Sequence, residues 1–141
     1  MTGREGITTA DGAKQLVGEL LKRGALIGIA TGEVEDLVKN RLQRAGMYEM
    51  FKFGEYGNHH RDLKDVVSGA VKRASEFGFS GGKAWIICTS PIMVGAAKAA
   101  GAGAIGVAAG RYSADQLSAA GADLVVRSAG DRSKIIKCIF R

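Results

Sequence analysis

The sequence contains few proline, cysteine and aromatic residues. Its 141 residues include one proline and two cysteines, and aromatic residues make up 6% of the chain. Two cysteines are too few for a disulfide framework, and Cys88 and Cys138 both stand among apolar residues. We therefore expect two buried thiols in a cytoplasmic protein.

Long apolar runs are also missing. No run approaches the roughly 18–20 residues that a membrane-spanning helix needs, so we expect no membrane contact. Residues 1–12 hold no apolar core followed by a cleavage site, and we expect no secretory signal. With 46% hydrophobic and 24% charged residues, the composition is typical of a globular domain rather than a disordered chain.

The net charge of +6 comes from 20 Lys and Arg residues against 14 Asp and Glu residues. Such a balance permits binding of nucleic acids or of anionic small molecules. The basic residues are spread along the chain, however, and no aromatic side chains alternate with them as base-stacking platforms would. We interpret them as solvated helix faces and do not expect a nucleic-acid surface.

Apolar runs of strand length alternate with amphipathic segments of helix length. The pattern predicts helices over 11–23, 33–45, 62–77, 91–100, 114–120 and 131–139, and strands over 25–30, 51–53, 84–88, 104–108 and 124–126. Continuous apolar strands are typical of a parallel sheet that is covered on both faces. We therefore expect one α/β domain over 1–141, a three-layer Rossmann-like fold with a mainly parallel sheet and an irregular segment at 1–10.

In such a sheet, ligands bind beyond the carboxyl ends of the strands. Two loops take that position, Thr31–Gly32 after the strand at 25–30 and the loop 88–91 after the strand at 84–88. A hydroxyl group and free backbone N–H groups before a helix can hold an anion. Alternatively, Thr31 only caps the helix that follows.

Four segments carry a family resemblance. They are GALIGIATG at 24–32, the helix and short strand at 34–57, DLKDVVSGAVKRA at 62–74, and the block 85–126, which ends in Ser-x-x-x-Leu-x-x-x-Gly-Ala-Asp and a short apolar run. Together they resemble the C-terminal half of a haloacid dehalogenase superfamily phosphatase of the phosphoglycolate phosphatase-like branch. The resemblance implies a core domain that lacks the family's N-terminal Asp-x-Asp strand and its cap.

The resemblance also implies roles for individual residues. Family members attack phosphorus with one aspartate, move a proton with a second, hold a phosphoryl oxygen with Thr or Ser, and neutralise charge with Lys or Arg. Thr31, followed by Gly32, matches the hydroxyl position. The candidates for the basic position are Lys64 and Arg61, although Leu63 stands in the expected register and one residue turns a helix by about 100°. Alternatively, Lys64 is a solvated lysine.

The family's metal loop usually has the sequence Gly-Asp-Thr-Pro-x-Asp. With Pro91 as the anchor, Thr89 stands at the first Asp, Ser90 at the Thr and Met93 at the second Asp. No Asp or Glu lies within 86–110, and no Asp-x-Asp occurs in the chain. Because Mg²⁺ prefers carboxylate oxygens and water, we expect no metal cofactor. With nucleophile, acid/base and metal ligands all absent, we expect no phosphatase activity.

Other chemistries find less support. A cysteine phosphatase built on Cys88 needs an arginine six residues further on, and Val94 stands there. The glycine pattern within 101–106 follows a helix and leads into a strand, which is the reverse of a dinucleotide-binding loop. The histidine pair 59–60 lacks partners at metal-site spacing, and we interpret it as two loop histidines.

The resemblance implies that a central strand between 25–30 and 84–88 is missing. Such a gap leaves backbone groups without hydrogen-bond partners. Each buried polar group without a partner lowers the stability of the fold by about 1–3 kcal/mol. The two strands can pair directly, a partner chain can insert a segment, or residues 1–10 can fold in, with 7–9 as a strand candidate. We expect direct pairing or a homodimer.

Three functions stay open. The first is a catalytically inactive, phosphatase-like domain that binds a phosphate-containing small molecule or acts in assembly. The second is a Mg²⁺-dependent phosphate monoester hydrolase that another polypeptide completes. The third is a basic nucleic-acid-binding module.

Overall fold

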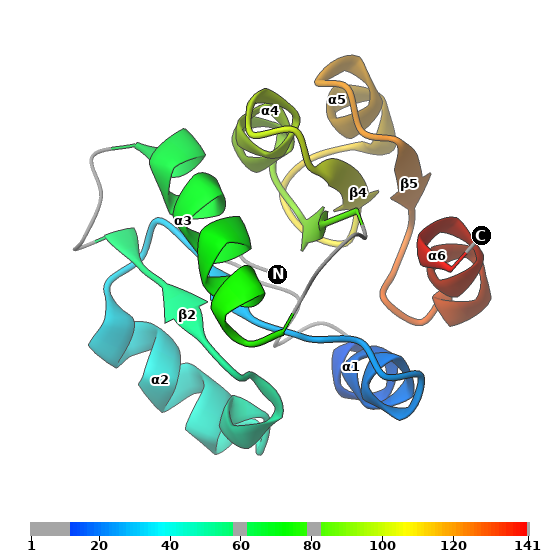
Figure 1. The fold of residues 1–141 in the computed structure, drawn as a ribbon. Coiled ribbons are helices and arrows are strands. Elements are labelled where there is room, and N and C mark those ends of the chain that lie inside the picture. Colours follow the sequence, from blue (N-terminus) through cyan, green and yellow to red (C-terminus); the bar gives the residue numbers. More distant parts are fainter. Residues whose placement is uncertain (1–11, 58–61, 79–82, 141) are drawn as a thin grey trace.

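The computed structural model describes residues 12–57, 62–78 and 83–140 (Figure 1). The helices are α1 (Ala13–Lys22), α2 (Glu35–Arg44), the short 3-10 helix η2 (Tyr48–Met50), α3 (Leu63–Glu76), α4 (Pro91–Ala99), α5 (Ala114–Ala119) and α6 (Arg132–Ile139). The strands are β1 (Ile29–Ala30), β2 (Gly54–Glu55), β3 (Trp85–Cys88), β4 (Gly103–Val107) and β5 (Leu124–Val126). This order of helices and strands confirms the prediction. Among the described residues, no helix has the length and apolar character to cross a membrane.

The strands form two parallel sheets. β1 pairs with β2, and β3, β4 and β5 lie side by side in that order, with Ile105 of β4 opposite Ile87 and Leu124. Helices cover both faces of the strands (Figure 1). The predicted three-layer α/β fold of Rossmann-like architecture is therefore confirmed.

Neighbouring residues of a strand send their side chains to opposite faces, and each face has its own core. On one face Leu16 of α1, Leu42 of α2 and Ile135 of α6 are fully buried in a cluster that includes Ile87 and Ile105. On the other face, α4 and α5 pack against β3, β4 and β5, and α3 packs against β1, β2 and α4. Burying one large aliphatic side chain stabilises a fold by about 1.5–3 kcal/mol, so these clusters hold the layers together.

Side chains define where several helices begin. The Asp62 carboxylate accepts the N–H of Asp65 at 3.0 Å at the start of α3, and Ser90 caps α4 in the same way. Asp131 stands at the start of α6 as predicted, but its carboxylate accepts the N–H of Arg127 at 3.3 Å instead of a helix N–H. The Asp131 carboxylate therefore stabilises the loop before α6 and does not cap the helix.

The first two strands are shorter than predicted. Regular strand structure covers only the end of 25–30, and β2 begins just after the predicted 51–53. The ring of Phe53 lies against Gly28, where a Cβ would overlap it. The Phe53 carbonyl accepts the N–H of Ile29 at 3.0 Å, so hydrogen bonding between the two segments begins before β2 itself.

The expected direct pairing of 25–30 with 84–88 is wrong. β1 and β3 belong to different sheets. A cleft of about 660 Å³ lies between them, lined by 24–30 on one side and 83–87 on the other. Both strands therefore turn one backbone edge toward this space.

Candidate functional site

Thr31 follows β1 directly and lies at the carboxyl end of that strand, where its side chain is 2% exposed. Its hydroxyl oxygen accepts the N–H of Glu33 at 3.1 Å, and its own N–H donates to the Glu55 carbonyl at 3.1 Å. The oxygen thus stabilises the turn before α2, and the side chain is almost completely buried there. The helix-cap interpretation is wrong, because Val34 is the N-cap of α2 and no side chain caps that helix. Anion binding by Thr31 stays a prediction.

A partly buried ion pair holds the same turn. Arg41 donates to both carboxylate oxygens of Glu33, at 3.0 and 2.6 Å. The hydrogen bond to Glu33 raises the pKa of the Arg41 guanidinium. Because Arg41 neutralises Glu33, the nearest acid after β1 does not repel an anion at Thr31.

Two glycines let the chain approach itself at this turn. A Cβ on Gly57 would overlap the carbonyl oxygen of Gly32, and the Gly57 N–H donates to the Glu33 carbonyl at 2.9 Å. The neighbouring Tyr56 is buried, and burial raises the pKa of its phenol to about 12. It is therefore a neutral hydroxyl at physiological pH.

The first residue of α3 covers Gly32. A Cβ on Gly32 would lie 2.9 Å from Cδ2 of Leu63, whereas Lys64 is exposed. The structure thus brings Leu63, and not Lys64, against the turn after β1, as the helical register indicates. The second basic candidate, Arg61, and the histidine pair 59–60 lie outside the described residues, as does the strand candidate 7–9.

The loop after β3 carries the three positions that we compared with the metal loop. Thr89 is 6% exposed, and the Ser90 hydroxyl oxygen accepts the N–H of Met93 at 3.3 Å. Met93 itself is buried in the core formed by α3, α4 and α5. A hydroxyl, a helix cap and a core thioether do not match the carboxylate donor set that Mg²⁺ prefers.

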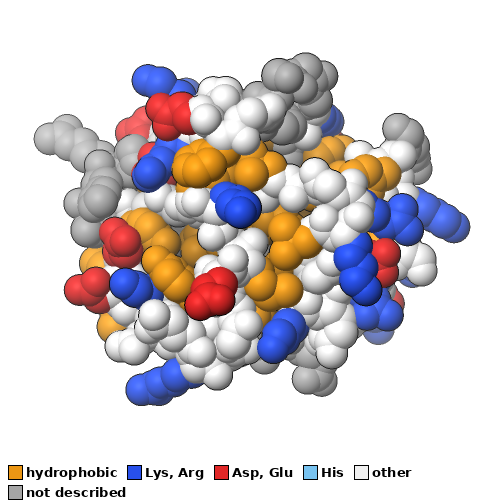
Figure 2. Space-filling model, turned by 60° about the horizontal axis from the view of Figure 1, so that its bottom comes forward, with side chains coloured by type: hydrophobic (Ala, Val, Ile, Leu, Met, Phe, Trp, Pro, Cys, Tyr) orange, Lys and Arg blue, Asp and Glu red, His pale blue; other side chains and the backbone are white. Residues whose placement is uncertain are grey.

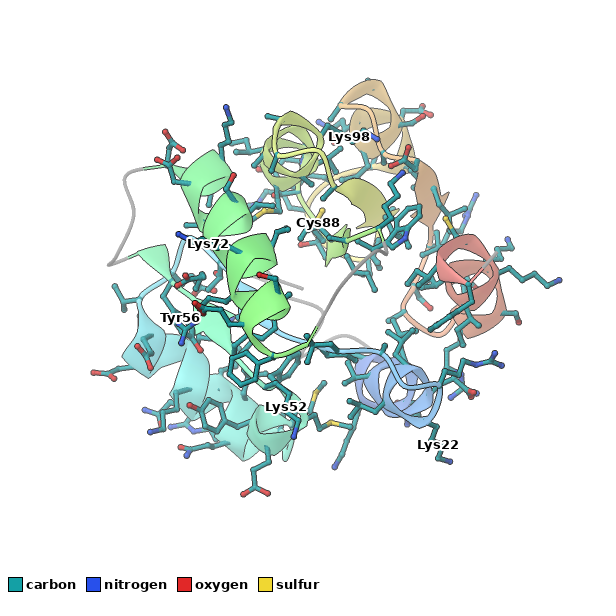
Figure 3. The ribbon with its side chains drawn as sticks, in the orientation of Figure 1. Lys22, Lys52, Tyr56, Lys72, Cys88 and Lys98 are labelled. Atoms are coloured by element: carbon teal, nitrogen blue, oxygen red, sulfur yellow. The ribbon has the colours of Figure 1, made fainter. Side chains whose placement is uncertain are left out.

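Cys88 ends β3 and lies in the interior beneath α4 (Figure 3). It is fully buried, and burial raises the pKa of its thiol to about 11. A thiol with such a pKa is protonated at neutral pH and is a poor nucleophile. This environment supports the interpretation of Cys88 as a small core residue.

Sequence reasoning missed a second ion pair at this edge. Arg73 of α3 donates to the Gly54 carbonyl at 3.2 Å and lies 3.7 Å from the carboxylate of Glu55, a side chain that is 13% exposed. The partners are 18 or 19 residues apart, and no local spacing rule relates them. Two carboxylates, Glu33 and Glu55, therefore each lie beside an arginine.

The polar side chains directly after β1 and β3 are Thr31, Thr89 and Ser90. Hydroxyl groups and the N-terminus of α4 can hold an oxyanion by donated hydrogen bonds. Within 12–57, 62–78 and 83–140, no three His, Cys, Asp or Glu side chains form a group that could hold a metal ion.

Solved structures share this arrangement. A conserved haloacid dehalogenase-like protein of unknown function from Agrobacterium tumefaciens matches with a TM-score of 0.76 at 22% identity, over 94% of this chain and 61% of that chain. A haloacid dehalogenase-like hydrolase from Streptococcus pneumoniae matches with 0.76 at 14%, over 93% and 59%. A predicted phosphoglycolate phosphatase from Haemophilus somnus matches with 0.77 at 18%, over 90% and 56%. The chain has the fold of the haloacid dehalogenase-like phosphatases.

The family resemblance of the sequence is thereby confirmed at the level of the haloacid dehalogenase-like fold. The chain spans about 60% of the length of these structures. No protein-family model and no curated protein matches the sequence. Because a fold hosts many activities, the activity of this domain has to be argued from its own side chains.

Proposed function

We propose that this chain is a haloacid dehalogenase-like domain without phosphatase activity that binds a phosphate-containing anion at the carboxyl ends of β1 and β3. The observation that carries the proposal is the loop after β3. There Thr89 offers a neutral hydroxyl, Ser90 caps α4, and Met93 belongs to the core. These side chains do not fit Mg²⁺, so we derive no step through a metal.

The turn after β1 supports anion binding. Thr31 can donate its hydroxyl hydrogen, because its oxygen already accepts from Glu33. Arg41 neutralises the Glu33 carboxylate, which removes a source of repulsion. The N-terminus of α4, which follows β3, carries a partial positive charge. These groups can bind a phosphate-containing small molecule, but they include no carboxylate placed for attack.

Two measurements test this function. With p-nitrophenyl phosphate and Mg²⁺, the purified chain should give no turnover above buffer, and steady turnover would end the inactive assignment. Titration calorimetry with inorganic phosphate should detect binding. Thr31→Val should weaken it about tenfold or more, since a hydrogen bond to a charged group contributes about 1.5–3 kcal/mol. Thr31→Ser keeps the hydroxyl and serves as the control. Equal phosphate affinity of the unchanged chain and both variants would show that the anion does not bind at this turn.

A second candidate is a Mg²⁺-dependent phosphate monoester hydrolase that another polypeptide completes. The cleft between β1 and β3 favours it, because its lining extends to Ala30 and Ile87, just before the loops that carry Thr31 and Thr89. The incoming segment would have to supply every catalytic carboxylate, including the metal ligands that the β3 loop lacks. For that reason we rank it second.

A further inference from the structure

A second pocket lies at the amino ends of β3 and β5, next to α6. It has a volume of about 700 Å³, and its wall on the strands includes Lys83, Trp85, Asp123 and Leu124. Trp85 and Leu124 are the first residues of β3 and β5. The pocket therefore lies at the opposite end of β3 from the loop that carries Thr89, and it is separate from the anion site proposed above.

Two lysines of α6 form the other wall of this pocket. Lys134 and Lys137 both line it and are exposed, and because they are three residues apart they lie on one face of the helix. Figure 2 shows Lys and Arg side chains close together on the side of the molecule where Figure 1 places α6. Along the sequence these lysines are distant from Trp85, the single tryptophan, and only the fold brings them to it.

A third lysine is positioned by the tryptophan itself. The Lys83 ammonium lies over the Trp85 ring, 4.7 Å from its centroid. The ring in turn lies against Gly103 of β4, where a Cβ would overlap it. A ring that is packed against the sheet and attracts an ammonium group keeps a positive charge at the pocket before any ligand binds.

Positive charge predominates around the pocket. Among the described residues its one acid is Asp123, whose two carboxylate oxygens accept the Lys98 ammonium at 2.9 and 2.8 Å. That acid is therefore already neutralised. Lys83, Lys134 and Lys137 form no ion pair with any residue that the structure describes.

The walls between the lysines are apolar. They include Trp85, Leu124 and Ile139, and no Ser, Thr, Asn or Gln of the described part of the chain lines the pocket. A ligand body rich in hydroxyl groups would lose its hydrogen bonds to water there without replacing them, whereas a flat, largely apolar body would not. Lysine ammonium groups bind phosphate oxygens as point charges, and three of them suit a chain of phosphates better than a single one.

We propose that this basic pocket binds a nucleoside polyphosphate, with the phosphates between Lys83 and the two lysines of α6 and the base against the apolar wall. Its volume of about 700 Å³ lies within the range of small-molecule sites, about 300–1,000 Å³. The inference does not depend on the proposed function, because the two sites share no residue.

ADP without a metal ion tests the proposal on the full chain. Trp85 is the single tryptophan and lines the pocket, so its fluorescence reports binding. We expect a saturable change with ADP. Pyrophosphate should displace ADP with an affinity about tenfold weaker, because it buries no apolar body. Equal affinity of pyrophosphate and ADP would overturn the nucleoside assignment, and ADP binding no tighter than adenosine would overturn the role of the lysines.

A pair of lysine variants locates the nucleotide. Lys137→Gln should weaken ADP binding about fivefold, the effect of losing one unit charge about 4 Å from an anion in water. Lys72→Gln removes the same charge from an exposed position of α3, away from α6, and should leave binding unchanged (Figure 3). Circular dichroism confirms that both variants fold. Equal weakening by both variants, or by neither, would overturn the location.

A gain of affinity is the sharper result. Asp123→Asn removes the one acid from the described wall and should strengthen ADP binding about fivefold. Unchanged or weaker binding by this variant, with its fold intact, would overturn the proposal. ADP binding that Thr31→Val weakens as much as Lys137→Gln does would overturn it too, because the nucleotide would then bind at the turn after β1.

A short oligothymidine distinguishes a pocket for small molecules from a surface for nucleic acids. We expect it to bind more weakly than ADP. Tighter binding that Lys72→Gln and Lys137→Gln weaken equally would mean that the basic surface as a whole attracts nucleic acid, and the proposal would fail.

Discussion

The Leu63 side chain lies against Gly32, so the first residue of α3 closes over the turn that would receive an anion. A hydrophobic side chain stands where a cation would strengthen anion binding. Lys64, one residue on, is exposed. The register of α3 therefore decides whether a positive charge reaches the turn.

Leu63→Lys should raise the affinity for inorganic phosphate. A unit charge about 4 Å from an anion contributes about 1 kcal/mol in water, which corresponds to about fivefold in the dissociation constant. Lys64→Leu removes the exposed lysine and should change the affinity much less. Titration calorimetry on both variants checks the prediction, which fails when Lys64→Leu has the larger effect.

Arg41→Gln should destabilise the fold. The substitution leaves the partly buried Glu33 carboxylate without its two charged donors, at a cost of about 1–3 kcal/mol. The matched control is Arg23→Gln, which breaks an exposed pair with Glu19 and should cost about 0–1 kcal/mol. Urea denaturation gives both free energies of unfolding; equal losses would contradict the structural difference between the pairs.

Gly57→Ala and Gly95→Ala should act in opposite directions. A Cβ on Gly57 would overlap the Gly32 carbonyl, so the turn after β1 must shift and the melting temperature should fall. A Cβ on Gly95 meets nothing within 4 Å in the middle of α4. Alanine there should stabilise the helix by about 0.5–1 kcal/mol. Thermal melts of the two variants provide the comparison, and a higher melting temperature for Gly57→Ala would refute it.

Stability should fall at alkaline pH through Cys88. Burial raises the pKa of its thiol from 9.0 to about 11. Between these values the unfolded chain loses the proton while the folded chain keeps it, so the free energy of unfolding decreases as pH rises. Urea denaturation between pH 8 and 11 should show a shallower decrease for Cys88→Ala than for the unchanged chain. Parallel curves would mean that the thiol does not contribute.

The sequence predicts the order of helices and strands because each amphipathic or apolar pattern is local. The contact of Leu63 with the turn also follows from helical register. The Glu33–Arg41 pair joins residues eight apart across a turn and a helix, and no periodicity encodes it. Arg73 reaches Gly54 only once α3 has folded back over β2. The separation of β1 from β3 is equally a property of tertiary packing, which strand patterns do not contain.

β4 is hydrogen-bonded on both sides, to β3 and to β5, whereas β1 is paired with β2 alone among the described strands. No ladder links the two sheets within 12–57, 62–78 and 83–140, so between these strands side-chain packing carries the cooperativity. Sub-global opening should then begin in the half of the fold around β1 and β2, and β4 should be the last element to lose its structure. The fold thus has a part around β4 that resists local unfolding and a part around β1 and β2 that opens more easily, and the cleft lies between the two.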